Sequence, residues 1–179
     1  RDPEMSRGLG DVYKRQKIRV DKEGAGMGWG AVYAQYLESM DQISGQGNGL
    51  SVSRQLYKGD EALNESAPLK VGDKITVRLT VKADRDMDFV QIKDDRAACM
   101  EPLQAVSGFR WSNGLGYYQA TKDASTQFFI DQMRKGTYVI EYQVYVNRTG
   151  EYQAGIATVQ SAYAPEFGGH TGGYRVMVE

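Results

Sequence analysis

Cysteine and histidine are nearly absent from this sequence, which has one of each, Cys99 and His170, among 179 residues. A single cysteine excludes an internal disulfide framework and a four-cysteine zinc site. A nucleophilic cysteine needs a base or a cation that lowers its pKa, and His170 lies far along the chain. Although folding could bring the two together, we expect Cys99 to be a small buried apolar side chain.

Long apolar runs and an excess of charge of one sign are also missing. No stretch approaches the roughly 20 apolar residues that a membrane helix requires, so no membrane span is expected in this chain. The 22 basic and 23 acidic residues are interspersed, and no basic field is available to hold phosphates. Nucleic acid is therefore not an expected partner.

Proline is scarce, with four residues, whereas glycine and tyrosine are abundant, with 21 and 12. This composition favours a β-rich chain with many turns. Apolar and polar residues alternate over residues 50–57 and, most clearly, over residues 74–82, as expected for half-buried strands. Further strands are expected at residues 89–94, 116–121, 126–131, 137–147, 151–164 and 174–178. The spacing of strands and turns predicts an all-β fold, an antiparallel β-sandwich of the immunoglobulin-like type.

The amino-terminal part is expected to be organised differently. Residues 1–16 lack periodicity and an apolar signal segment, and we interpret them as a non-native or disordered leader. Residues 29–37 are apolar on both faces, which fits either a buried strand or a helix segment, with strand favoured by the flanking glycines. Residues 44–49, SGQGNG, are predicted to be a linker before a sandwich that spans residues 50–179.

Glu166 and His170 have the spacing of two metal ligands on one face of a helix. Pro165 and the glycines around His170 disfavour a helix, and a third ligand is not evident. We expect a tight connection that leads into the last strand.

Acidic residues form two further groups. Asp84, Asp86 and Asp88 alternate as calcium ligands can, but they flank a predicted hairpin turn, and no glycine stands at the sixth place of a calcium loop. Asp94 and Asp95 are adjacent, and paired carboxylates are one pattern for acid/base chemistry. A solvated turn is the expected role of the first group. No metal, cofactor or catalytic residue is predicted.

Two other patterns concern ligands on the surface. Asn64 and Asn147 each begin a glycosylation sequon, a tripeptide that also arises often by chance. Exposed tyrosines can stack on sugars or on protein partners. Tyrosines sufficient for such a platform, if they are not half-buried on a sheet face, are Tyr117, Tyr118, Tyr138, Tyr142, Tyr145, Tyr152 and Tyr163.

Several motifs occur together in a recognisable order: FFID at residues 128–131, KGTYVIEY at 135–142, GEYQAG at 150–155 and YAPE at 163–166. In order and spacing they resemble the carboxy-terminal domain of bacterial alpha-2-macroglobulins, notably the Bacteroidota forms. DR at 95–96 and EP at 101–102 also fit, although AAC at residues 97–99 replaces the usual PAG. The GWGA sequence at 28–31 is similar to the end of the preceding CUB-like domain, which the resemblance assigns to residues 17–43.

The resemblance implies a macroglobulin-like β-sandwich in a large protease trap, an endopeptidase inhibitor of the bacterial cell envelope, either periplasmic or anchored to the outer membrane, or of the extracellular space. Its implied partners are the CUB-like and helical thioester domains of the parent chain and, through the intact parent, target proteases. Some members capture the protease by a Cys-Gln thioester. Here Pro102 stands three residues after Cys99 and has no side-chain carboxamide, so this pair cannot form one.

A non-enzymatic domain that acts by packing and conformational change is therefore the favoured function. The alternative is a carbohydrate-binding or adhesin sandwich, which would need a planar aromatic platform on one exposed face. An enzyme is the third possibility, and no nucleophile, base and orienting residue can be assembled for it from one cysteine and one histidine.

Overall fold

The computed structural model describes residues 23–28, 39, 43–64 and 67–179. The chain divides into two compact units, Arg1–Glu38 and Ser39–Glu179. In the first unit, the described residues 23–28 form a bend in which Gly24 and Gly26 have positive φ angles. The predicted leader and most of the predicted CUB-like segment, residues 17–43, lie outside the described residues.

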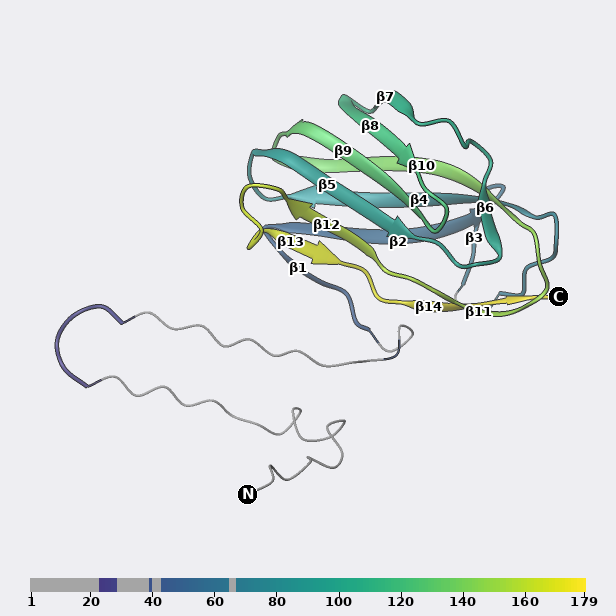
Figure 1. The fold of residues 1–179 in the computed structure, drawn as a ribbon, viewed down its shortest axis with the longest axis horizontal. Helices are drawn as coiled ribbons and strands as arrows, with labels where there is room; N and C mark the ends of the chain where they lie inside the picture. Colours follow the sequence, from purple (N-terminus) through teal and green to yellow (C-terminus); the bar gives the residue numbers. More distant parts are fainter. Residues whose placement is uncertain (1–22, 29–38, 40–42, 65–66) are drawn as a thin grey trace, which may run out of the picture. The chain divides into compact units, whose positions relative to one another are not determined.

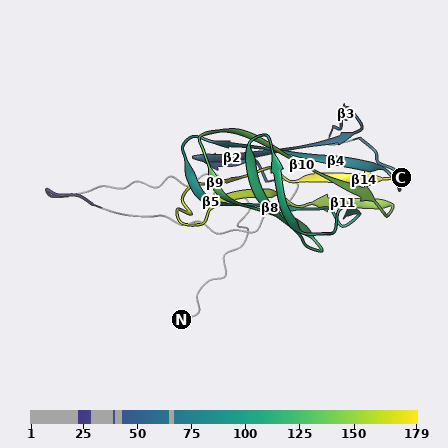
Figure 2. The same ribbon diagram turned by 90° about the horizontal axis from the view of Figure 1, so that it is seen from above.

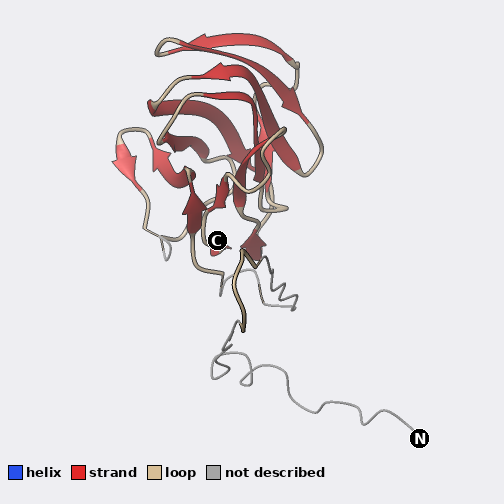
Figure 3. Cartoon of the chain, turned by 90° about the vertical axis from the view of Figure 1, so that its left-hand side faces the viewer, coloured by secondary structure: helices blue, strands red, loops and turns tan. Residues whose placement is uncertain are grey.

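The described part of the second unit consists of strands and turns (Figures 1 and 3). No helix that is long and apolar enough to cross a membrane occurs among the described residues. The strands are β1 (Gln46–Asn48), β2 (Leu50–Lys58), β3 (Glu61–Ala62), β4 (Lys74–Ala83), β5 (Met87–Asp95), β6 (Met100–Pro102), β7 (Gly108–Ser112), β8 (Leu115–Thr121), β9 (Ser125–Met133), β10 (Gly136–Val146), β11 (Gly150–Ala154), β12 (Ala157–Ser161), β13 (Gly168–His170) and β14 (Tyr174–Val178).

Antiparallel pairing joins twelve of these described strands in the order β6-β10-β4-β2-β1-β13-β12-β5-β9-β8-β7, with β3 beside β2. Strands β11 and β14 pair separately. The long sheet folds over, so that β10, β4 and β2 form one layer and β12, β5, β9 and β8 form the other (Figures 1 and 2; β12 is labelled in Figure 1). The predicted all-β antiparallel sandwich is confirmed.

The core lies between these two layers. On β4 the alternating residues Ile75, Val77, Leu79 and Val81 are buried, while the residues between them are partly or fully exposed. From the opposite layer, Phe128 is completely buried and its ring centroid lies 5.9 Å from that of Tyr142 on β10. The period of two in the sequence therefore identifies the buried face correctly, because successive strand residues point to opposite sides.

The glycine-rich residues 44–49, which the sequence predicts to be a linker, contain a short strand. They include β1, which pairs with β13 from Gln46↔His170 to Asn48↔Gly168. Glycine permits this pairing because the backbones approach closely: a Cβ on Gly47 would lie 2.6 Å from the Leu50 carbonyl oxygen. Whether the segment also separates two domains stays a prediction.

The connection predicted to enter the last strand contains a strand of its own, β13, within the glycine-rich residues 168–170. The single strand predicted over residues 151–164 is also corrected, because it is two strands in two sheets. β11 pairs with β14, whereas β12 pairs with β5. The chain passes between the sheets at Gly155, where a side chain would collide with Asp95.

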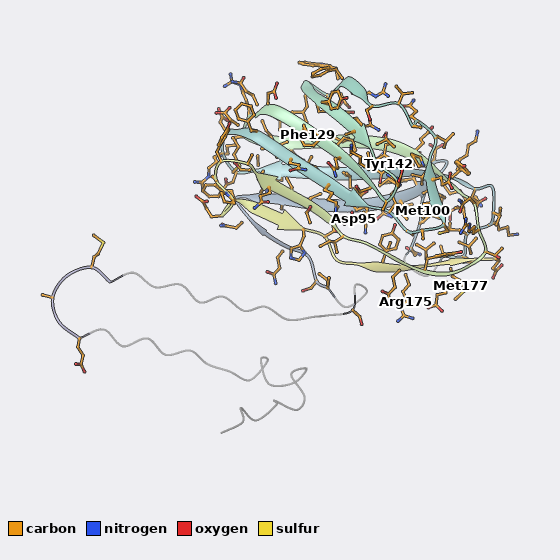
Figure 4. All side chains as sticks on the ribbon, in the orientation of Figure 1. Asp95, Met100, Phe129, Tyr142, Arg175 and Met177 are labelled. Atoms are coloured by element: carbon orange, nitrogen blue, oxygen red, sulfur yellow. The ribbon has the colours of Figure 1, made fainter. Side chains whose placement is uncertain are left out.

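A buried ion pair joins the two layers. Arg54 on β2 donates a hydrogen bond from Nη1 to Oδ1 of Asp94 on β5 at 2.5 Å, and the two side chains are 5% and 1% exposed. The Tyr142 hydroxyl donates to the other carboxylate oxygen at 2.7 Å (Tyr142 is labelled in Figure 4). Arg54 also donates to the Gly155 carbonyl at 2.6 Å and lies 4.5 Å from the centroid of the Tyr174 ring. Each charge is thus satisfied, as a buried charge must be.

Burial and the neighbouring opposite charge shift the pKa of Arg54, and likewise that of Asp94, in opposite directions. Burial has the largest single effect on the pKa of Arg54 and lowers it. The charge of Asp94, the nearby Tyr174 and Tyr142, and the hydrogen bond to Asp94 together outweigh burial, so the pKa of Arg54 is raised. Burial raises the pKa of Asp94, against the lowering effect of Arg54 and of the Tyr142 hydrogen bond. Burial also raises the pKa of Tyr142, and it raises the pKa of Tyr174 to about 12. Both phenols therefore stay protonated at neutral pH, and Tyr142 remains a hydrogen-bond donor.

We expect Arg54→Met or Asp94→Leu alone to lower the free energy of unfolding by about 3–5 kcal/mol, because either change leaves an unpaired buried charge. The double variant should lose less than the sum of the two, since no charge remains in the core. Urea unfolding of all four proteins measures this coupling. Arg78→Met is the control, because its pair with Glu141 is on the surface and should contribute little. Additive losses in the double variant would contradict the role assigned to the ion pair.

Candidate functional site: an exposed aromatic face

The outer side of strands β7, β8 and β9 has an unusual concentration of aromatic side chains. The β7–β8 hairpin turns at Asn113 and Gly114, both with positive φ, which is the backbone of a type I′ turn. Its register places Phe109 opposite Tyr118, and the β8–β9 register places Tyr118 opposite Phe129. Three aromatic side chains therefore form one row across three neighbouring strands.

These rings are exposed to different degrees. Phe109 is 82% exposed, Trp111 76% and Phe129 39%, and Phe109 contacts Tyr118 edge to face with their centroids 5.1 Å apart. The Trp111 ring lies against Gly116, where a Cβ would come within 2.8 Å of it. The absence of a side chain at Gly116 thus leaves the space that the indole occupies.

Phe89 on β5 and Tyr163 after β12 extend this surface. Phe89 has a φ of 52°, a left-handed conformation that is rare for a bulky residue and costs of order 1–3 kcal/mol. Its ring is 48% exposed and meets the Tyr163 ring edge to face at 5.1 Å. The Ala162 amide donates to the Phe89 carbonyl at 2.8 Å, which holds this backbone in place. We call these six residues the aromatic face: Phe89, Phe109, Trp111, Tyr118, Phe129 and Tyr163.

The aromatic face borders a groove of about 1200 Å³, whose lining also includes Asp88, Asp131 and Arg134. The exposed side of an antiparallel sheet is normally polar. Clustered exposed aromatic residues with charged neighbours are typical of interaction surfaces. We therefore identify this groove as the candidate functional site, with the features of a binding surface.

The sequence predicted only part of the aromatic face. The seven tyrosines considered for a platform do not share one surface: Tyr117 and Tyr142 are buried, whereas Tyr163 is 78% exposed. Strand β7 was not predicted, and its Phe109 and Trp111 were therefore missed. The signal was present in the sequence, because FRW places two aromatic residues at alternate positions, on the same side of a strand.

Cys99 lies in the core and is completely buried. Burial raises the pKa of its thiol, which disfavours the nucleophilic thiolate. Its carbonyl accepts a hydrogen bond from the Asn147 amide at 2.8 Å, so the residue is fixed at the turn before β6. This position fits the expected structural role.

Glu166 and His170 are not on a helix, because His170 is the last residue of β13 and Glu166 lies in the preceding turn. The Glu166 carbonyl accepts a hydrogen bond from Asn48 at 2.7 Å, and His170 Nδ1 lies 3.1 Å from the Thr171 carbonyl oxygen. Within the described ranges, no three histidine, cysteine, aspartate or glutamate side chains gather closely enough to hold a metal ion.

The β4–β5 turn contains the acidic residues considered as calcium ligands. Asp84 forms an ion pair with Arg85 at 2.8 Å, and Asp86 accepts a hydrogen bond from the Lys135 amide at 2.7 Å. These exposed contacts fit the expected solvated turn.

The adjacent carboxylates Asp94 and Asp95 point to different surroundings. Asp95 pairs with Lys93 at 2.9 Å, whereas Asp94 belongs to the buried ion pair. The position of Arg54 on the apolar side of β2, between Val52 and Leu56, was the sequence signal for a buried partner.

The two sequons differ in their surroundings. Asn64 is exposed. The Asn147 side-chain amide donates to Glu101 at 2.6 Å, so its nitrogen is already engaged in the folded protein.

We expect native Cys99 to resist alkylation, because the thiol is both inaccessible and held with a raised pKa. Reaction with iodoacetamide at pH 8, followed by mass spectrometry, should be at least tenfold slower for the folded chain than for the chain in 6 M guanidinium chloride. Equal rates would show that the thiol is reactive and exposed in solution.

Comparison with known proteins identifies the family of this chain. The family model for the bacterial alpha-2-macroglobulin MG10 domain matches residues 49–166, which is more than half of the chain. A curated relative, circularly permutated Ras protein 2 of Dictyostelium discoideum, is 26% identical over 171 residues. That match covers 92% of this chain and 4% of the relative.

Solved structures share the fold. Salmonella alpha-2-macroglobulin reacted with methylamine superimposes with a TM-score of 0.62 at 20% identity, over 75% of this chain and 10% of that chain. Trypsin-activated alpha-2-macroglobulin from Escherichia coli gives a TM-score of 0.64 at 15% identity, over 76% and 11%.

A native E. coli fragment that spans domain MG7 to the carboxy terminus gives 0.63 at 17% identity, over 75% and 24%. The present chain thus corresponds to a small part of each relative. With the family model matched over residues 49–166, this chain belongs to the bacterial alpha-2-macroglobulin MG10 domain family.

Proposed function

We propose that this chain is a non-catalytic domain of a large bacterial protease trap, in which it packs against neighbouring domains and takes part in a conformational change after protease cleavage. The family supports this proposal, as does the small share of each solved relative that the chain covers. One solved E. coli relative is described as trypsin activated and another as activated by porcine elastase. A domain of such a chain has neighbours to contact.

The aromatic face is the observation that carries the proposal. Phe109 and Trp111 expose more than three quarters of their surface, although β7 is the last strand of its sheet and has one unpaired edge. Exposed apolar edges favour non-specific association unless another surface covers them. Tryptophan, tyrosine and phenylalanine are also enriched at the centres of protein interfaces. A neighbouring domain of the parent chain would cover this face.

The chemistry of the chain supports a packing role over a catalytic one. Cys99 is buried and is followed three residues later by Pro102, so it can form no thioester with a glutamine there. A thioester in the parent would have to lie in another domain. We further propose the carboxy-terminal position, the CUB-like preceding domain, the Bacteroidota type and a location in the bacterial cell envelope or outside the cell, all of which rest on the sequence resemblance.

The proposal predicts one result for the isolated chain and two for the parent protein. The isolated chain should leave trypsin and elastase activity unchanged, whereas limited proteolysis of the full-length parent should change its shape in small-angle scattering or native electrophoresis. Hydroxyl-radical footprinting of the parent should show Trp111 protected before or after cleavage, because a neighbouring domain covers it in at least one state. A parent with unchanged shape after cleavage would contradict the trap.

The matched control is Met177, an exposed side chain on β14, distant from the face in the view of Figure 4, in which Phe129 and Met177 are both labelled. Its oxidation rate in the isolated chain gives the reference for an accessible side chain. Should Trp111 be as accessible in both states of the parent as in the isolated chain, the aromatic face would have no role in packing.

Carbohydrate binding is the second candidate function, and the aromatic face is also the observation that favours it. Exposed rings beside Asp131 and Arg134 offer flat apolar surfaces with hydrogen-bonding groups at the margin. On this hypothesis, a glycan array should detect binding by the chain, and Trp111→Ala should weaken that binding at least tenfold without loss of folding. An array with no binder at millimolar ligand would remove this candidate.

A further inference from the structure

Two carboxylates lie beside the rings of the aromatic face without an ionic partner. Asp88 on β5 and Asp131 on β9 are both exposed, and both line the groove that the aromatic face borders. Among the described residues, neither side chain forms a hydrogen bond or an ion pair. The nearby Asp86 differs, because it already pairs with Arg134 at 3.4 Å. The groove therefore carries negative charge that no ion pair within the described chain neutralises.

An interruption of the strand alternation brings these carboxylates to the surface. β5 has two consecutive exposed residues, Asp88 and Phe89, between buried neighbours, whereas a regular strand would alternate. The interruption coincides with the positive φ of Phe89. β9 has the same interruption at Asp131 and Gln132. Two neighbouring strands thus expose a carboxylate at the same level of the sheet.

Asp131 occupies the middle of the aromatic face. It lies on the same side of β9 as Phe129, two residues earlier, which is labelled in Figure 4. On β5 it is opposite Phe89, because the paired residues before and after it keep one register. When the β8–β9 register is continued by two residues, Asp131 comes opposite Gly116, against which the Trp111 ring lies. Rings therefore stand beside this carboxylate along its own strand and on both neighbouring sides.

The two arginines that line the groove have other contacts. Arg134 is 80% exposed and pairs with Asp86. Arg110 directly precedes Trp111 on β7 and therefore points to the other side of that strand, where it donates to the Val106 carbonyl at 3.4 Å. A cation beside Asp131 would have to come from another surface.

Elsewhere the chain shows which cation fits between a carboxylate and a ring. Arg54 pairs with Asp94 and lies 4.5 Å from the centroid of the Tyr174 ring. Arg78, which pairs with a surface glutamate, lies 4.3 Å from the centroid of the Tyr57 ring. A planar guanidinium can stack on a ring while its N–H groups bond to a carboxylate, and the compact ammonium of lysine has no such plane. The aromatic face offers the same combination of rings and carboxylate to an arginine from outside.

We propose that the aromatic face binds an arginine side chain of the neighbouring domain, with its guanidinium paired to Asp131 between the Trp111 and Phe89 rings. This inference rests on the proposed function, in which that domain packs on the face, and it names the residue type that anchors the contact. Arginine is enriched together with aromatic residues at the centres of protein interfaces. Asp88 adds a second negative charge at the groove, which attracts the same cation during association.

The experiment titrates the chain with acetyl-Leu-Arg-Leu-amide and follows the Trp111 indole N–H signal by NMR. The matched probe replaces arginine by citrulline, which keeps the length and the planar end of the side chain but has no charge. The arginine peptide should bind about fivefold more tightly, as an exposed cation–π contact and an exposed ion pair together allow. This advantage should shrink in about 1 M salt, where charges are screened beyond about 3 Å.

Substitution identifies the carboxylate responsible. Asp131→Asn should remove the preference for arginine over citrulline and leave the weak apolar binding of both peptides. Asp60→Asn is the matched control, because Asp60 is an exposed carboxylate in the turn between β2 and β3, and this variant should keep the preference. Equal binding of the two peptides to the unaltered chain, which needs no variant, overturns the arginine contact. A preference that survives Asp131→Asn overturns it as well.

These outcomes are distinct from a failure of the proposed function. The accessibility of Trp111 in the two states of the parent tests whether a domain covers the face, whereas the peptide titration tests which side chain the face accepts. Protection of Trp111 in the parent, together with equal binding of the arginine and citrulline peptides, would refute this inference alone.

Discussion

The buried ion pair between Arg54 and Asp94 is the constraint on which the arrangement of the sandwich depends. Each charge is costly in the core unless the other is present, so β2 in one layer and β5 in the other must meet in a single register. The same contact fixes two further elements, because Tyr142 on β10 donates to Asp94 and Arg54 donates to the Gly155 carbonyl between β11 and β12. One polar network thus holds four parts of the chain together inside an apolar core.

Glycine residues allow the close strand pairing through which the sheet continues from one layer into the other. The β1–β13 pairing requires Gly47 and Gly169, because a Cβ on either would stand within 2.7 Å of a carbonyl oxygen. Glycine at these two positions therefore allows the close β1–β13 pairing, which connects β2 in one layer to β12 in the other.

The aromatic face combines exposed rings with an unusual backbone. The Trp111 ring lies against Gly116, and Phe89 has a strained backbone conformation. Strain of the kind seen at Phe89 commonly occurs at functional positions. This chain covers a small part of each solved relative, and a neighbouring domain is the proposed partner of the aromatic face.

The sequence by itself determined the strand content, the buried side of β4 and the structural role of Cys99, because side-chain alternation and turn residues act over a few neighbouring positions. Its ordered motifs also indicated the family. It did not predict β1, β7 or β13, whose short segments contain glycine or few alternations. Only the tertiary structure decided that Arg54 meets Asp94 and that Phe109, Tyr118 and Phe129 share one row. These contacts join residues far apart in the chain. Their geometry depends on strand register and on the packing of the two layers, which the local alternation of residues does not predict.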